Sequence, residues 1–87
     1  MEVTISSHAA KRQKERGISE TEVRAILASR ETAFIPSKKD SEAIIVLGKI
    51  KSNVWGVVLN VNTMNVITVR KASKKERGFY EKEVKSH

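Results

Sequence analysis

Cysteine is absent from this 87-residue chain, and histidine and aromatic residues are scarce. Without cysteine there is no disulfide framework and no thiolate zinc site. The two histidines are too few for a histidine-rich metal site. Paired carboxylates and a Gly-rich phosphate loop are also missing from the sequence. We therefore expect neither a metal ion nor another cofactor.

Long apolar runs are missing as well. A membrane span needs about 18 consecutive apolar residues, and no run in the sequence approaches that length. The N-terminus lacks the apolar segment of a signal peptide. We therefore expect a cytoplasmic protein with no membrane partner. The single proline and four glycines fit turns, so residues 1–87 are expected to form one domain.

Positive charge is what the chain has in excess. Seventeen Lys and Arg residues face ten Asp and Glu residues, which gives a formal net charge of +7. Seven cations follow one another between residues 49 and 77 with few acids between them: Lys49, Lys51, Arg70, Lys71, Lys74, Lys75 and Arg77. Clustered cations in a small basic domain are typical of nucleic-acid binding. An acidic protein partner fits equally well, and solubility alone is a third explanation.

The clearest local signal lies at residues 18–29. Ser19 and Glu22 have the spacing of a helix-capping box, and Ile18 and Val23 have that of a hydrophobic staple. The helix that follows is expected to bury Val23, Ile26 and Leu27 on one face. An earlier helix is expected from about residue 8 to residue 16, ended by a glycine and preceded by a short strand at residues 3–5.

The rest of the chain alternates strands with short turns. Strands are expected at residues 43–47, 54–61 and 66–70, and an edge strand near Phe34 remains open. Short connections predict an antiparallel meander. In the last strand, simple alternation places Val66, Thr68 and Arg70 on one face. A closing helix begins at Ser73, capped by Glu76.

These elements predict an α+β fold of order β-α-α-β-β-β-α, with an antiparallel sheet packed on the two N-terminal helices. The closing helix is expected to turn Phe79, Tyr80 and Val84 to one side. The opposite face of the sheet is expected to stay partly exposed.

Arg70 ends a strand and requires a partner for its guanidinium. A phosphate bound through two parallel hydrogen bonds is one alternative, and a salt bridge to Glu76 or Glu81 is the other. Tyr80 either assists proton transfer at a leaving oxygen or packs against the sheet.

Further cations have two interpretations each. The shared helical face of His8, Arg12 and Arg16 is the first case. These residues form a phosphate-contacting stripe in which His8 acts as an acid or base, or they make contacts within the fold. Lys49 and Lys51 flank a turn, where lysines contact a ligand or keep a sheet edge solvated. Trp55 is either a core residue or a platform for a nucleobase.

Two segments resemble known families. Residues 5–23 carry the pattern S-x-HA…R…RGIS…EV, which resembles the opening of a small bacterial family of unassigned function. Residues 67–80, ITVRKASKKER followed by a tyrosine, resemble the end of BrnT toxins, ISARKATKRER…Y. Both resemble the wider RelE/ParE-like group, whose usual order is a strand, a helical pair, a three-strand meander and often a closing helix.

The resemblance implies a type II toxin that cleaves RNA without metal, acts on free or ribosome-bound mRNA and is neutralised by an antitoxin. It marks Arg70, Lys71, Glu76, Arg77 and Tyr80 as site residues. In this hypothesis Arg70 clamps phosphate, Tyr80 or His8 moves a proton, and Glu76 completes the catalytic set.

The RNA-binding set would be Arg12, Arg16, Lys49, Lys51, Lys71, Lys74 and Arg77. The alternative is a small basic module that binds nucleic acid or an acidic partner without catalysis. The aromatic-acidic N-terminal stretch of BrnT toxins is missing, and Val69 replaces the small residue before the arginine.

Overall fold

The computed structural model describes residues 3–85. Five strands and three helices follow one another as β1 (Thr4–Ile5), α1 (Ser7–Arg16), α2 (Glu20–Ala28), β2 (Ala33–Pro36), β3 (Ala43–Ile50), β4 (Asn53–Asn60), β5 (Asn65–Lys71) and α3 (Lys74–Lys85). The α+β class and the helical pair are confirmed. The strand near Phe34, which the sequence left open, is present as β2.

The strands form one sheet in the order β1-β5-β4-β3-β2. Strands β2 to β5 pair antiparallel with their neighbours, so the expected meander is present. The first strand departs from expectation, because β1 lies parallel to β5. The sheet is therefore mixed, and the prediction of an antiparallel sheet was wrong at this edge. The chain between the two parallel strands comprises the helical pair and strands β2 to β4, so it is far longer than the turn that joins antiparallel neighbours.

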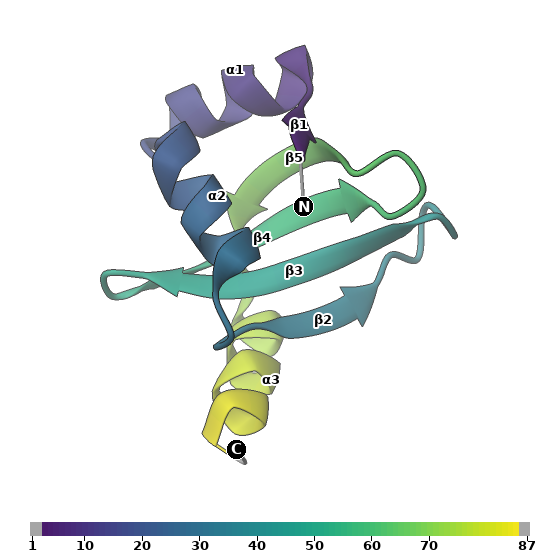
Figure 1. Cartoon of the computed structure of the whole chain (residues 1–87). Helices are drawn as coiled ribbons and strands as arrows, with labels where there is room; N and C mark the ends of the chain where they lie inside the picture. The colour runs from purple at the N-terminus through teal and green to yellow at the C-terminus, as the bar shows by residue number, and fades with distance from the viewer. Residues whose placement is uncertain (1–2, 86–87) are drawn as a thin grey trace.

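The helices lie on both faces of the sheet. Figure 1 shows α1 and α2 on one side and α3 on the other. On the first face, α1 packs on β5 and α2 on β3, whereas α3 contacts β2 and β3 from the second face. The helix also reaches β4 and β5, where Tyr80 belongs to one buried cluster with Val54 and Glu76 binds Arg70. No helix within residues 3–85 has the length and apolar character to cross a membrane.

Local signals begin and end the first two helices as predicted. The Ser6 hydroxyl accepts the backbone N–H of Ala9 at 3.0 Å, and Gly17 ends α1 in the left-handed region at φ 75°. Ser19 and Glu22 form the complete capping box of α2, with N···O distances of 3.1 and 2.9 Å. These caps satisfy backbone groups that a helix end otherwise leaves unpaired.

A β-bulge breaks the alternation of the last strand. Val58 pairs with Thr68, but the next residue, Leu59, pairs with Val66, so Ile67 is the extra residue. Val66 and Val69 consequently face the same side and are fully buried. The predicted grouping of Val66 with Thr68 and Arg70 on one face was therefore wrong.

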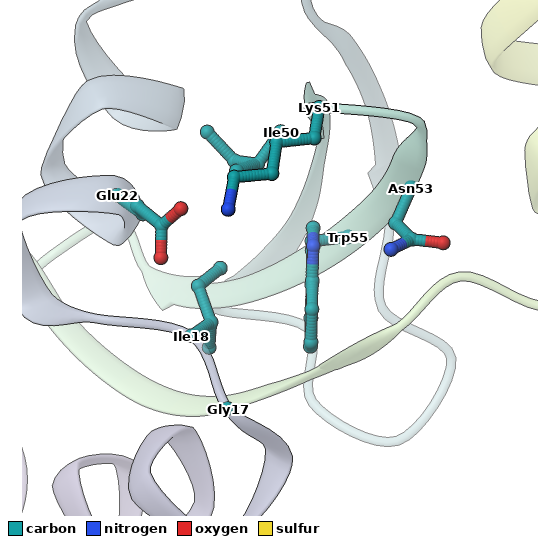
Figure 2. A pocket seen from close by; sticks show the side chains of 7 residues that line it. All are labelled: Gly17, Ile18, Glu22, Ile50, Lys51, Asn53 and Trp55. Carbon is teal, nitrogen blue, oxygen red and sulfur yellow. The ribbon is translucent and has the colours of Figure 1, made fainter.

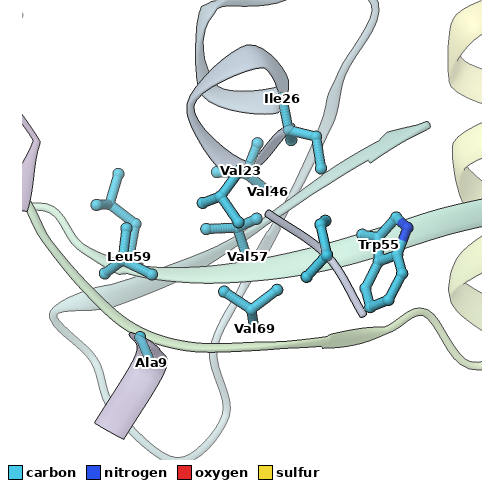
Figure 3. Close-up of a cluster of buried hydrophobic side chains, with 10 residues drawn as sticks. Ala9, Val23, Ile26, Val46, Trp55, Val57, Leu59 and Val69 are labelled. Carbon is cyan, nitrogen blue, oxygen red and sulfur yellow. The ribbon is translucent and has the colours of Figure 1, made fainter. Parts of the chain in front are cut away.

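The larger core lies between the sheet and the helical pair. Val23 and Ile26 of α2 meet Val46, Val57 and Val69 of the three central strands (Figure 3). Leu27 packs against this cluster while staying half-buried. Trp55 belongs to the same cluster at 4% exposure, so its core interpretation is the one observed.

A smaller core lies under α3. Tyr80 is the buried residue of this helix and packs with Ala33, Leu47 and Val54, while Val84 packs at the edge. Phe79 is 37% exposed and is not part of this cluster. The expectation that it lies on the same side as Tyr80 was wrong, because adjacent helical residues are turned about 100° apart.

We predict that Gly48→Ala destabilises the fold by about 1–3 kcal/mol. An added Cβ would lie 2.5 Å from Cγ2 of Ile26 and 3.2 Å from its Cβ, where a branched side chain at the α2–β3 contact has little room to move. Gly78→Ala is the matched control, since no atom lies within 4 Å of the added Cβ in α3. That change is expected to stabilise by about 0.5–1 kcal/mol. Equal urea midpoints for the two variants would contradict the prediction.

Candidate functional site

Strand register gathers cations at one end of the sheet. The β3–β4 turn lies at this end, because Lys49 pairs with Val54, and β5 ends there, because Trp55 pairs with Lys71. Helix α3 begins three residues after Lys71. We call this region the basic end; its members are Arg16, Lys49, Lys51, Lys71, Lys74, Lys75 and Arg77.

Three members of the basic end are engaged within the fold. Arg16 donates to the carbonyl of Val69 at 3.2 Å, where the β5 backbone has passed the short β1. Lys49 pairs with Glu81 of α3 at 3.4 Å. The Lys71 ammonium lies 5.9 Å from the ring centre of Trp55, within cation–π range.

Four other cations of the basic end are not held in this way. Within residues 3–85, no hydrogen bond or ion pair engages the side chains of Lys51, Lys74, Lys75 and Arg77. All four residues are exposed. They form the part of the basic end that can meet an anion without first breaking an internal contact.

The predicted stripe on α1 is not a uniform binding surface. Arg12 pairs with Glu15 at 3.4 Å, and Arg16 is committed to the β5 backbone. His8 is exposed at the start of α1. Since α1 and α3 lie on opposite faces of the sheet, the structure does not bring His8 together with Arg70 or Tyr80.

Arg70 is held by Glu76. Its Nη1 and Nη2 atoms lie 2.6 and 2.8 Å from the two carboxylate oxygens, a bidentate pair. Glu76 also accepts the backbone N–H of Ser73 at 2.8 Å, and Ser73 caps the N–H of Glu76. Of the two alternatives for Arg70, the structure contains the salt bridge. The Arg70 guanidinium, with help from Ser73, lowers the pKa of Glu76 to about 2, and Glu76 raises that of Arg70.

The Tyr80 hydroxyl is directed into the fold. It donates to the backbone carbonyl of Glu31 at 3.2 Å, and the residue is 3% exposed. Burial, together with the nearby Glu31 and Glu81, raises the pKa of Tyr80. The structure therefore shows the packing alternative, with the hydroxyl satisfying the carbonyl before β2.

A small pocket of about 180 Å³ opens at the basic end between α2 and the β3–β4 turn. Figure 2 shows the Glu22 carboxylate and the Lys51 ammonium pointing toward the same space, beside Ile18 and Trp55. The Ser19 backbone N–H lowers the pKa of Glu22, and the charge of Lys51 contributes. Sequence reasoning missed Glu22 as a site residue, because the capping box explained it fully.

A larger hollow of about 590 Å³ lies at the opposite end of the sheet. It is apolar, and its lining includes the exposed Phe34 and Val61 together with Leu27 and Met64. Its character does not suit a polyanion. As to metal ions, no group of three or more His, Cys, Asp or Glu side chains is close enough within residues 3–85 to hold one.

A family model described as a domain of unknown function, DUF4258, matches residues 5–71. The chain belongs to this family. Searches of curated proteins and of solved structures returned no match.

The DUF4258 match runs from β1 to the end of β5. It includes Lys51, Lys71 and the pocket residues Glu22 and Trp55. It ends before α3, which carries Glu76 and Tyr80. In this DUF4258 chain, the pair between Arg70 and Glu76 therefore joins the matched region to the helix that follows it.

We predict that Glu76→Gln lowers the free energy of unfolding at neutral pH by about 1–3 kcal/mol. A carboxyl whose pKa falls on folding from 4.5 to about 2 stabilises the fold at pH above 4.5. This contribution is lost as the pH falls from 4.5 toward about 2, so the two proteins should converge there. Urea unfolding at several pH values measures the difference.

The control is Glu15→Gln, which removes the carboxylate of an exposed pair. Exposed pairs contribute little, so this change is expected to stay within about 0.5 kcal/mol of the unsubstituted protein. A pH-independent loss in Glu76→Gln would contradict the assignment.

Proposed function

We propose that this protein binds RNA through the basic end of its sheet. The observation that carries the proposal is that strand register brings separate cationic segments together, and that the side chains of four exposed cations make no hydrogen bond or ion pair within residues 3–85. An excess of positive charge spread evenly would serve solubility. Seven of the seventeen Lys and Arg residues lie at this one end, beside a polar pocket, and this grouping favours a polyanion as the ligand.

The charges of the basic end are suited to phosphate contacts. Lysine ammonium groups neutralise phosphates and release counterions, which makes affinity fall steeply as salt rises. Four such contacts with a single strand give a slope of about −3 in log K against log salt. The opposite end of the sheet has the apolar hollow instead, so the two ends are expected to differ sharply in RNA affinity.

We predict that the double variant Lys74→Gln, Lys75→Gln weakens binding to single-stranded RNA about tenfold at moderate salt. The salt slope should become shallower by about 1.4, since two phosphate contacts are lost. The matched control is Lys38→Gln, Lys39→Gln. Both lysines are exposed, adjacent and located on the β2–β3 connection at the other end of the sheet.

Fluorescence anisotropy of a labelled RNA at several salt concentrations measures both quantities. The control should retain the affinity and slope of the unsubstituted protein. Equal effects of the two double variants would show that net charge alone drives binding. Salt-insensitive binding, or none, would contradict the proposal.

A second candidate function is a toxin-type, metal-independent endoribonuclease of the RelE/ParE-like group. Its support is the resemblance of residues 67–80 to BrnT toxins, an element order that includes a strand, a helical pair, a meander and a closing helix, and the position of Arg70. The Arg70 side chain is 33% exposed on the second face of the sheet, beside the start of α3.

In this mechanism the ribose 2′-hydroxyl loses its proton to water and attacks the adjacent phosphate. The bond from phosphorus to the 5′-oxygen of the next nucleotide breaks, that oxygen takes up a proton from water, and cations stabilise the charge that develops. Arg70 contributes only if a phosphate replaces Glu76 as its partner, because Glu76 stays ionised at neutral pH. Tyr80 is buried and donates to a backbone carbonyl. Participation of its hydroxyl would require the helix to move.

We predict that induced expression arrests growth with cleavage of mRNA, that Arg70→Ala abolishes the arrest, and that Tyr80→Phe retains it. Tyr80→Phe removes the hydroxyl but preserves the packing of the ring, at a stability cost of about 1 kcal/mol. Growth curves and RNA integrity measure the outcome, with soluble protein quantified for each variant.

Normal growth with intact RNA from soluble protein would exclude the toxin. Loss of the arrest in soluble, folded Tyr80→Phe would instead assign its hydroxyl to the reaction. An antitoxin encoded beside the gene is the proposed partner, and its co-expression should restore growth.

A further inference from the structure

The pocket at the basic end holds an acceptor and a donor that do not satisfy each other. Glu22 and Lys51 both line it, yet no salt bridge within 4.0 Å joins them, and residues 3–85 supply no other ion pair to either side chain. One carboxylate oxygen of Glu22 accepts the Ser19 N–H at 2.9 Å. This contact restrains the carboxylate, which points toward the pocket (Figure 2), and within residues 3–85 the second oxygen accepts no hydrogen bond.

Lys51 is held over the pocket by a tight turn. Ile50 pairs with Asn53, so Lys51 and Ser52 form a two-residue connection, and Lys51 has a φ of 58°. Glycine adopts this left-handed backbone far more readily than lysine. Lys51 therefore occupies a position whose backbone conformation favours glycine.

The pocket has a hydrophobic wall and a restricted volume. Ile18, Ile50 and Trp55 supply apolar surface beside the two charged groups. At about 180 Å³ the space is smaller than the roughly 300–1,000 Å³ typical of sites for drug-sized ligands. It suits a single flat, polar ring.

We propose that this pocket binds one guanine base of single-stranded RNA, with Glu22 and Lys51 reading its Watson–Crick edge. The proposal rests on RNA binding by the basic end. Lys51 belongs to both, and the Lys71 ammonium lies 5.9 Å from the ring of Trp55 in the pocket wall, so a strand bound at Lys71 passes beside the pocket.

Guanine matches the two groups by hydrogen-bond type. Its N1–H and N2–H₂ groups are neighbouring donors for the Glu22 carboxylate, and its O6 accepts from the Lys51 ammonium. Adenine presents an acceptor at N1, where the carboxylate requires a donor. Uracil offers a single ring N–H between two carbonyls. The pair therefore favours guanine over adenine and uracil.

The test compares two short RNAs that differ at one position, a uridine strand with one central guanosine and the same strand with one central adenosine. The unsubstituted protein should prefer the guanosine strand about tenfold. Trp55 is the chain's single tryptophan, so its fluorescence reports occupancy directly. Guanosine monophosphate should change this signal at concentrations where adenosine monophosphate does not.

Glu22→Gln, compared with a control, distinguishes a loss of guanine recognition from an effect on folding or on net charge. Glutamine also completes a capping box, so α2 is retained, but the second oxygen is replaced by a donor. The control is Glu20→Gln on the same helix, whose carboxylate pairs with Arg24 outside the pocket. Both variants lose one negative charge and should bind all-uridine RNA equally well or slightly more tightly. Only Glu22→Gln should lose the preference for guanosine.

Lys51→Gly provides the second arm. It relieves the left-handed backbone, so it is expected to fold at least as well, while its preference for guanosine should fall several-fold. Equal affinity for the two strands in the unsubstituted protein, or a preserved preference in Glu22→Gln, would overturn the guanine site. Salt-dependent binding would then still support the RNA surface. Absence of all RNA binding would overturn both.

Discussion

The bidentate pair between Arg70 and Glu76 couples the last strand to the last helix. Glu76 accepts from the Arg70 guanidinium and from the backbone of Ser73, so one carboxylate both anchors α3 to β5 and caps its first turn. This anchoring sets the direction of α3 and allows Tyr80 to close the smaller core over β2 and β3. It also leaves the Arg70 side chain one-third exposed on this face, where the main contacts of α3 are with β2 and β3. The buried and the accessible surfaces thus depend on the same contact.

Features that depend on residues near in sequence could be predicted, whereas pairings between residues far apart in sequence could not. Ser19 and Glu22 lie within one turn, so their capping box was legible in the sequence. The bulge at Ile67 depends on how Leu59 pairs across the sheet, and the hydrophobic pattern of β5 alone cannot place it. The parallel pairing of β1 with β5 likewise joins residues about sixty positions apart. Two-residue strands have too little pattern to specify a partner.

For the candidate site, the cationic residues could be named from the sequence, but the contacts that each side chain makes could not be predicted from it. Lys49 and Lys51 look alike in sequence, yet Lys49 pairs with Glu81 and Lys51 faces a pocket. For Arg16 the sequence left a phosphate contact and a role within the fold open, and in the structure the guanidinium donates to the carbonyl of Val69, where β1 is too short to pair. Cations of a basic domain therefore divide into those that complete the fold and those that remain for a ligand. Which group a cation belongs to is decided by its tertiary contacts.

Glu22 shows how one residue serves both purposes. A capping carboxylate uses one oxygen for the helix, and its orientation is then fixed without further contacts. The remaining oxygen is preorganised, so a ligand that donates to it bears little cost for ordering the side chain. Lys51 has no such anchor in its side chain, but its backbone is fixed by the short turn. In the proposed site, a helix cap positions Glu22 and a tight turn positions Lys51. Both are ordinary structural features, so no sequence motif marks the pocket.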